Sequence, residues 1–178
     1  MDSRLLIDVL DQMRGRSLKN YALPGLESTL LDRGKLRLFE ASRDTEEHLT
    51  PHNHRFNFAC LVLQGEVTNV VYRPTGGRGG ETYAVSKLMP ITDGLGKYRL
   101  EYEGVQETFF KETAIYGEGD VYGMLADEIH SIKFSRNAVV LFFEGPAMRE
   151  GTHILEPVVD GDRLPTFRCE PWMFKEAH

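Results

Sequence analysis

The sequence contains little of what several protein classes require. Its 178 residues include two cysteines, Cys60 and Cys169, which are too few for the disulfide framework of a small secreted protein. No apolar run approaches the roughly eighteen residues of a membrane-spanning helix. The N-terminal segment MDSRLLIDVLDQM lacks the apolar core and the small-residue cleavage site of a secretory signal. We therefore expect a cytoplasmic protein without a membrane partner, in which Cys60 is a buried, reduced thiol.

Basic residues are also few. Lys and Arg number 21 against 27 Asp and Glu, which gives a formal net charge of −6, whereas a nucleic-acid surface needs clustered Lys and Arg. Hydrophobic residues make up 41% of the chain and charged residues 27%, an ordinary balance for a globular protein. The length fits one domain. We expect a single domain over residues 1–178 that binds a small-molecule substrate and no nucleic acid.

Local patterns predict an all-β domain with one helix. Apolar residues recur at helical spacing over residues 3–14, and this helix would pack outside a barrel or in the contact of a homodimer. From residue 35 onward, short β-branched segments alternate with Gly and Pro at the spacing of a sandwich or barrel. The expected organisation is an N-terminal helix and arm over 1–25, a barrel over 35–145 and an irregular C-terminal tail over 146–178.

Turn residues and apolar runs give further local predictions. Gly65 predicts a hairpin in which Phe58–Leu63 pairs with Glu66–Tyr72. The glycine-rich segment Arg73–Glu81 lacks the Gly-Lys-Ser/Thr ending of a phosphate-binding loop, so we interpret it as a hairpin loop. In the C-terminal tail, the lone Trp172 is expected to serve packing rather than ligand binding.

Two histidines stand at the start of a strongly apolar strand. The segment Thr50–Gly65 reads TPHNHRFNFACLVLQG, in which His52 and His54 are two residues apart and share one face of an extended chain. Two imidazoles backed by apolar side chains suit a divalent metal. A third ligand must come from elsewhere, and His130, at the end of GDVYGMLADEIH, is the best candidate.

The spacing of the two histidine segments resembles the paired signature motifs of the cupin superfamily. The first segment has His52, His54, a strand and a glycine turn. The second has Gly119, a turn-like segment, His130 and a further strand. The resemblance covers about residues 45–145. It implies an all-β fold, the cupin-type double-stranded β-helix or jelly roll, with the metal site inside it.

The same resemblance bears on the ligand set. Cupins usually place a metal-binding glutamate about four or five residues after the second histidine, where this chain has Phe58 and Ala59. Three neutral imidazoles would leave the metal its full double charge and favour anionic ligands at its open positions. Such a site is similar to that of the thiol dioxygenases. It implies one divalent ion, Fe2+ ahead of Zn2+, Ni2+ or Mn2+, with His48 or Glu128 in reserve as a fourth ligand.

The resemblance therefore implies an Fe(II) dioxygenase acting on a small anionic or chelating substrate of the thiol or diketone class. Cysteine dioxygenases also carry a Cys–Tyr pair near the iron. Cys60 lies one residue from the matching place, and its tyrosine partner is left open. The candidate catalytic residues are Cys60, Tyr72, Tyr122 and Glu128.

Two other functions fit the same residues. In a cupin resembling the deoxysugar epimerases, a barrel histidine would act as general base without a metal, with Tyr72, Tyr122 or Glu144 as the acid. In a non-catalytic binding module, the barrel would hold a small ligand and the histidines would be incidental. Metal content separates the first of these from a dioxygenase, and turnover separates the second.

Overall fold

The structure, a computed structural model, describes residues 3–19, 23–31, 35–46, 51–90, 98–159 and 162–163. Three residues of the sequence predictions, His48, Cys169 and Trp172, lie outside these residues. The chain begins with one helix, α1 (Ser3–Gln12), and continues in strands. Among the described residues, no helix is both long enough and apolar enough to cross a membrane.

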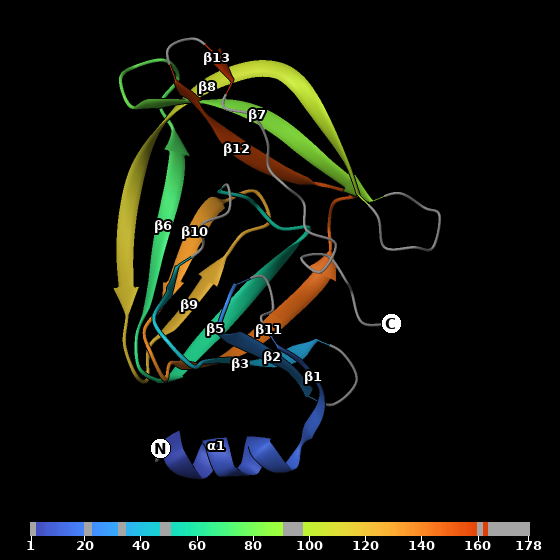
Figure 1. Ribbon diagram of the computed structural model, residues 1–178, viewed down its shortest axis with the longest axis vertical. Coiled ribbons are helices and arrows are strands. Elements are labelled where there is room, and N and C mark those ends of the chain that lie inside the picture. Colours follow the sequence, from blue (N-terminus) through green and yellow to red (C-terminus); the bar gives the residue numbers. More distant parts are fainter. Residues whose placement is uncertain are drawn as a thin grey trace.

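The strands form two antiparallel sheets (Figure 1). The first sheet has the order β1-β2-β3-β11-β5-β9, and these strands span Arg14–Lys19, Leu26–Leu31, Leu36–Ala41, Val139–Ala147, Phe56–Gln64 and Val121–Met124. The second sheet has the order β13-β12-β7-β8-β6-β10-β4, and these strands span Asp162–Arg163, Thr152–Val159, Glu81–Pro90, Tyr98–Tyr116, Val67–Pro74, Ile129–Phe134 and Thr45–Glu46.

Eight of these strands have the connectivity of a jelly roll. The four-strand run β3-β11-β5-β9 belongs to the first sheet and the run β4-β10-β6-β8 to the second. From β3 to β6, and again from β8 to β11, each strand lies in the opposite sheet from the one before it. This alternation is the double Greek key of a jelly roll. The predicted all-β jelly roll with an N-terminal helix is confirmed.

The predicted hairpin between Phe58–Leu63 and Glu66–Tyr72 is wrong. β5 pairs with β9 and β11, whereas β6 pairs with β8 and β10 in the other sheet. Gly65, between them, has a φ of 74°, and an added Cβ would lie 2.8 Å from the Ala138 backbone. A positive φ is accessible to glycine at little cost, so the turn carries the chain from one sheet to the other instead of folding it back.

The long strand β8 extends the second sheet beyond the barrel. Its C-terminal half pairs with β6 and its N-terminal half with β7. β6 and β7 therefore lie end to end beside β8, which curves over the top of the molecule in Figure 1. The glycine-rich segment Arg73–Glu81, expected to be a hairpin loop, instead projects between these two strands. A bulge interrupts the β7–β8 ladder where Val85 opposes Val105 and Ser86 opposes Tyr102.

Both ends of the chain contain more strand than the sequence indicates. β1 lies within the expected N-terminal arm, and β12 lies within the tail that was expected to be irregular. β12 pairs with β7 along Thr152–Pro157. Proline cannot donate to a strand ladder and is tolerated where a strand has a neighbour on one side. Pro157 meets this condition, because β13 pairs with β12 only at Val158 and Val159.

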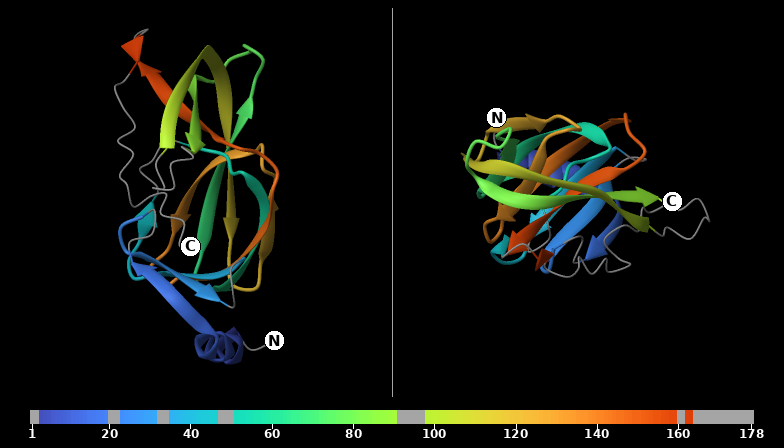
Figure 2. Two further views of the ribbon diagram at one scale, coloured as in Figure 1. Left: turned by 90° about the vertical axis from the view of Figure 1, so that its right-hand side faces the viewer. Right: turned by 90° about the horizontal axis from the view of Figure 1, so that it is seen from above.

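The barrel has an inner core and an outer apolar layer. The inner core joins the two sheets through residues such as Phe58, Val62, Val67 and Phe134. On the outer face of the first sheet, Leu10 of α1 packs in a cluster with leucines and a valine from β2, β3, β5 and β11. Figures 1 and 2 show α1 outside the barrel, as the sequence predicts. This cover explains why β5 is apolar on both of its faces.

Candidate metal centre

Backbone hydrogen bonds hold the two histidine segments together. His52 N donates to His130 O at 3.0 Å, and His130 N donates to His52 O at 2.9 Å. His52 therefore bridges to β10, and it forms a second bridge to Ile154 of β12. Residues that exchange both backbone hydrogen bonds in an antiparallel pair carry their side chains on the same face. His54, two residues after His52, points to that face as well.

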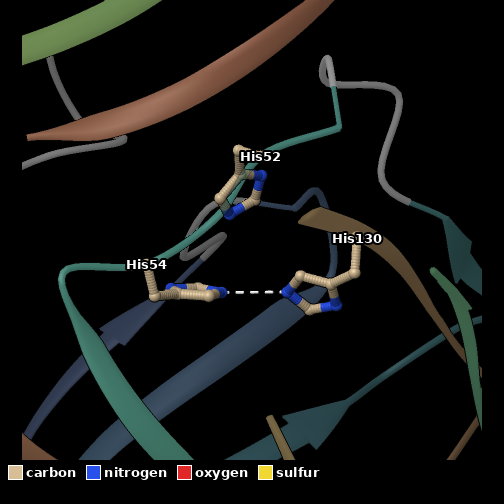
Figure 3. Close-up of side chains that lie close together, drawn as sticks. All are labelled: His52, His54 and His130. Carbon is tan, nitrogen blue, oxygen red and sulfur yellow. Dashed lines mark hydrogen bonds between the residues drawn. The ribbon is translucent and has the colours of Figure 1, made fainter. Parts of the chain in front are cut away.

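The three imidazoles converge on one point (Figure 3). One ring nitrogen from each of His52, His54 and His130 lies within 4.8 Å of the other two. The Nε2 atoms of His54 and His130 are 2.9 Å apart. Two nitrogens that each lie about 2.0–2.1 Å from one ion, at right angles to each other, would be separated by about 2.9 Å. The structure thus brings together the three predicted ligands in an arrangement that fits a metal ion.

The histidines open into an apolar cavity of about 150 Å3 between the two sheets. The described residues that line it, besides the three histidines, are Leu23, Leu26, Arg37, Phe39, Phe56, Phe58, Cys60, Tyr122, Ile132, Phe134, Phe142 and Glu144. Phe56, Phe58 and Cys60 follow the histidines on one face, as the strand phase predicts. The ring of Phe58 lies 4.9 Å from that of His54, centroid to centroid.

Burial keeps the imidazoles of His54 and His130 neutral. It lowers the pKa of His130 to about 3, with a smaller contribution from His52. Burial also lowers the pKa of His54 well below the ordinary histidine value, and His52 and His130 lower it further. A neutral imidazole has a lone pair to offer, and deprotonated ligands are what a metal requires. At neutral pH His54 and His130 therefore present metal-binding nitrogen atoms and not positive charges.

Cys60 and Tyr122 stand directly opposite each other in the register of β5 and β9. Both line the cavity. Burial raises the pKa of the Cys60 thiol to about 12 and that of Tyr122 well above its ordinary value. Tyr122 is thus the tyrosine that faces Cys60, which the sequence left open. In the native protein both groups stay protonated at neutral pH.

Tyr72 and Glu128, two other sequence candidates, do not line the histidine cavity. Tyr72 packs with Tyr83 and Phe109 and lines a separate cavity of about 330 Å3. The Glu128 carboxylate accepts a hydrogen bond from Arg73 at 2.7 Å and another from the Leu125 amide at 2.9 Å. Glu144 lines the histidine cavity, and His48 lies outside the described residues.

Two residues at the site went unnoticed in the sequence. Arg37, half-buried on β3, lines the cavity, but nothing in the sequence LRLFEA distinguishes it from a solvated charge. Asn69 on β6 accepts a hydrogen bond from His130 Nδ1 at 3.0 Å and is 2% exposed. The sequence does contain a sign of this residue, because Asn69 is the single amide within the β-branched segment EVTNVVY.

Comparisons with known proteins find only solved structures of low sequence identity. No protein-family model matches the chain, and no curated protein matches it. Among solved structures, it is similar to the cupin domain of Drosophila melanogaster CENP-C, with 11% identity and a TM-score of 0.43 over 82% of this chain and 100% of that one.

Two further solved structures show a likeness of similar extent. Hydroquinone 1,2-dioxygenase PnpCD, in complex with Cd2+ and 4-hydroxybenzonitrile, has 13% identity and a TM-score of 0.35 over 66% of this chain and 61% of its own. KdgF from Halomonas sp. has 13% identity and a TM-score of 0.34 over 76% and 82%.

Proposed function

We propose that the three-histidine cluster is an iron(II) site and that this chain is a dioxygenase. Its substrate would be a small anionic or chelating molecule of the thiol or diketone class. The observation that supports the proposal most directly is the convergence of three imidazole nitrogens in an apolar cavity, where burial lowers the pKa of His54 and of His130. No carboxylate belongs to this group among the described residues.

The donor set fits a divalent transition metal. His52, His54 and His130 would hold the ion, because neutral imidazole suits iron, nickel, copper and zinc. Bound there, an Fe(II) ion would supply a Lewis acid with its full double charge and open positions for a substrate and for dioxygen. The aromatic wall excludes water and lowers the local dielectric, which strengthens attraction for an anion.

The cavity also bears on the size and charge of the substrate. A space of about 150 Å3 is comparable to engineered cavities that hold one benzene molecule. Only a small molecule, or the reactive end of a larger one, would fit. Arg37 contributes the positive side chain among the described lining residues and would orient an anionic group, while Tyr122, on β9 of the same sheet, offers a protonated hydroxyl.

Oxygen consumption tests the proposed activity. The iron(II)-loaded protein, prepared without a metal-chelating tag, would be mixed with a panel of small thiols and β-diketones under air. We expect substrate-dependent oxygen uptake that His54→Ala abolishes and Glu128→Gln preserves, since Glu128 pairs with Arg73 away from the cluster. Iron-loaded protein that consumes no oxygen with any of these compounds would contradict the proposal.

An isomerase without metal is the second candidate. It is favoured by one observation, the presence of Tyr122 in the same cavity as neutral imidazoles. A neutral histidine could accept a proton while the tyrosine donates one. Chelator treatment separates the two functions, because an isomerase of this kind would keep its activity after every metal ion has been removed.

A further inference from the structure

Asn69 is a polar residue at a buried position of the barrel. It lies on β6 between the buried Val67 and the partly buried Val71, and its own side chain is 2% exposed. Burying an amide costs free energy unless its hydrogen bonds are satisfied. The Nδ2 atom of Asn69 has no hydrogen-bond partner among the described residues. The bond from its other end is therefore the interaction that accounts for this residue.

That bond goes to one of the three candidate ligands. Asn69 Oδ1 is 3.0 Å from His130 Nδ1. In the β6–β10 register, His130 stands opposite Val71 and Asn69 opposite Ile132, so Asn69 is the diagonal neighbour of His130 on the inner face. An amide oxygen accepts hydrogen bonds and cannot donate them. Nδ1 of His130 must therefore carry the hydrogen, which leaves the lone pair on Nε2.

Nε2 is the atom of His130 that faces His54, at 2.9 Å. The Asn69 contact thus selects the tautomer in which the cavity-facing nitrogen can bind a metal. If the amide were turned round, Nδ2 would donate to Nδ1 and the hydrogen of His130 would move to Nε2.

We propose that Asn69 is a positioning residue, which holds His130 in the Nδ1–H tautomer and aims the Nε2 lone pair at the point where the three histidines converge. The consequence for a metal rests on the proposed function, whereas the tautomer itself does not. Partners of this kind commonly change metal affinity by about 10–100-fold when they are replaced.

The test uses nitrogen chemical shifts and metal affinity. Long-range 1H–15N spectra of the metal-free protein report which ring nitrogen of His130 carries the hydrogen. We expect Nδ1–H in the wild type and in Asn69→Asp, which keeps an acceptor, and a mixture or Nε2–H in Asn69→Leu. Titration with Co2+, followed by its visible absorption, should give an affinity about 10–100-fold lower for Asn69→Leu and close to wild type for Asn69→Asp.

Ser86→Ala is the matched control. Ser86 is fully buried on β7 and donates to Glu156 at 2.7 Å, so this variant also loses a buried hydrogen bond but should keep both the tautomer and the affinity. A wild-type His130 with its hydrogen on Nε2, or an Asn69→Leu variant with unchanged shifts, would overturn the proposal. A wild type that binds no Co2+ would contradict the metal site instead, and the nitrogen shifts would still decide the role of Asn69.

Discussion

His52 and His130 exchange both of their backbone hydrogen bonds, at 3.0 and 2.9 Å, although 78 positions separate them in the chain (130 − 52). Their link is made by the main chain and not by the rings. The barrel can therefore close around the site before any metal binds. Loss of either imidazole leaves this connection in place.

The first prediction concerns the His130 side chain. His130→Ala should remove metal binding, since two imidazoles hold an exchangeable ion poorly, while the backbone pairing with His52 preserves the fold. Circular dichroism would report the fold and Co2+ titration the metal. Full metal occupancy in this variant would show that the third ligand lies elsewhere, with His48 the next residue to replace.

The second prediction concerns the missing carboxylate. Phe58 is 7% exposed and its ring centroid is 4.9 Å from that of His54. Phe58→Glu should place a negative charge beside the metal and weaken azide binding about tenfold or more. The metal-free variant should lose a few kcal/mol of stability because the carboxyl is buried, and metal should restore part of it. Phe58→Leu, which stays apolar, should bind azide like the wild type.

The third prediction concerns the pH dependence of the metal-free protein. Burial lowers the pKa of His130 to about 3 in the native state, whereas an unfolded histidine titrates near 6.5. Between these values the unfolded chain binds the proton and the native chain does not, so the free energy of unfolding falls as the pH falls. Below about pH 6.5, His130 alone should lower the free energy of unfolding by roughly 1.4 kcal/mol for each pH unit. Above that pH its contribution should be constant.

Urea unfolding at several pH values between roughly 4 and 8 measures this effect, because that range includes both the expected slope and the plateau above it. His130→Phe removes the titrating group, so its stability should depend less steeply on pH than that of the wild type. Parallel profiles for the two proteins would show that the native site already accommodates a charged imidazole.

The fourth prediction concerns the thiol of Cys60. Because burial raises its pKa to about 12, the nucleophilic thiolate is scarce at neutral pH. In a Cys169→Ser background, which leaves Cys60 as the single cysteine, the native protein should react with a thiol reagent far more slowly than the urea-unfolded chain. Equal rates would place Cys60 outside the packed barrel wall.

The sequence predicts the jelly roll and the grouping of the three histidines, through strand patterns and the resemblance of the paired motifs. Strand phase alone puts His52 and His54 on one face, and the paired motifs point to His130. The apolar face that continues through Phe58 and Cys60 then becomes the cavity wall. The histidine pair and the apolar face need only the two-residue periodicity of a strand, whereas His130 depends on the family resemblance.

What the sequence could not predict depends on contacts between distant segments. Gly65 suits a tight hairpin as well as a turn between sheets, and only the pairing of β5 with β11 decides between them. Pro157 argues against a strand until β12 is known to lie beside β7. Asn69 and Arg37 acquire a role only once β6 and β3 lie beside the histidines.

Elemental analysis of untagged protein, before and after anaerobic reconstitution with Fe(II), tests the central claim most directly. We predict close to one iron per chain in the wild type and in Glu128→Gln, and almost none in His52→Ala, His54→Ala or His130→Ala, provided that each variant keeps the wild-type circular dichroism spectrum. A folded wild type that takes up no iron, or three histidine variants that all retain it, would contradict the assignment of these residues as the metal site.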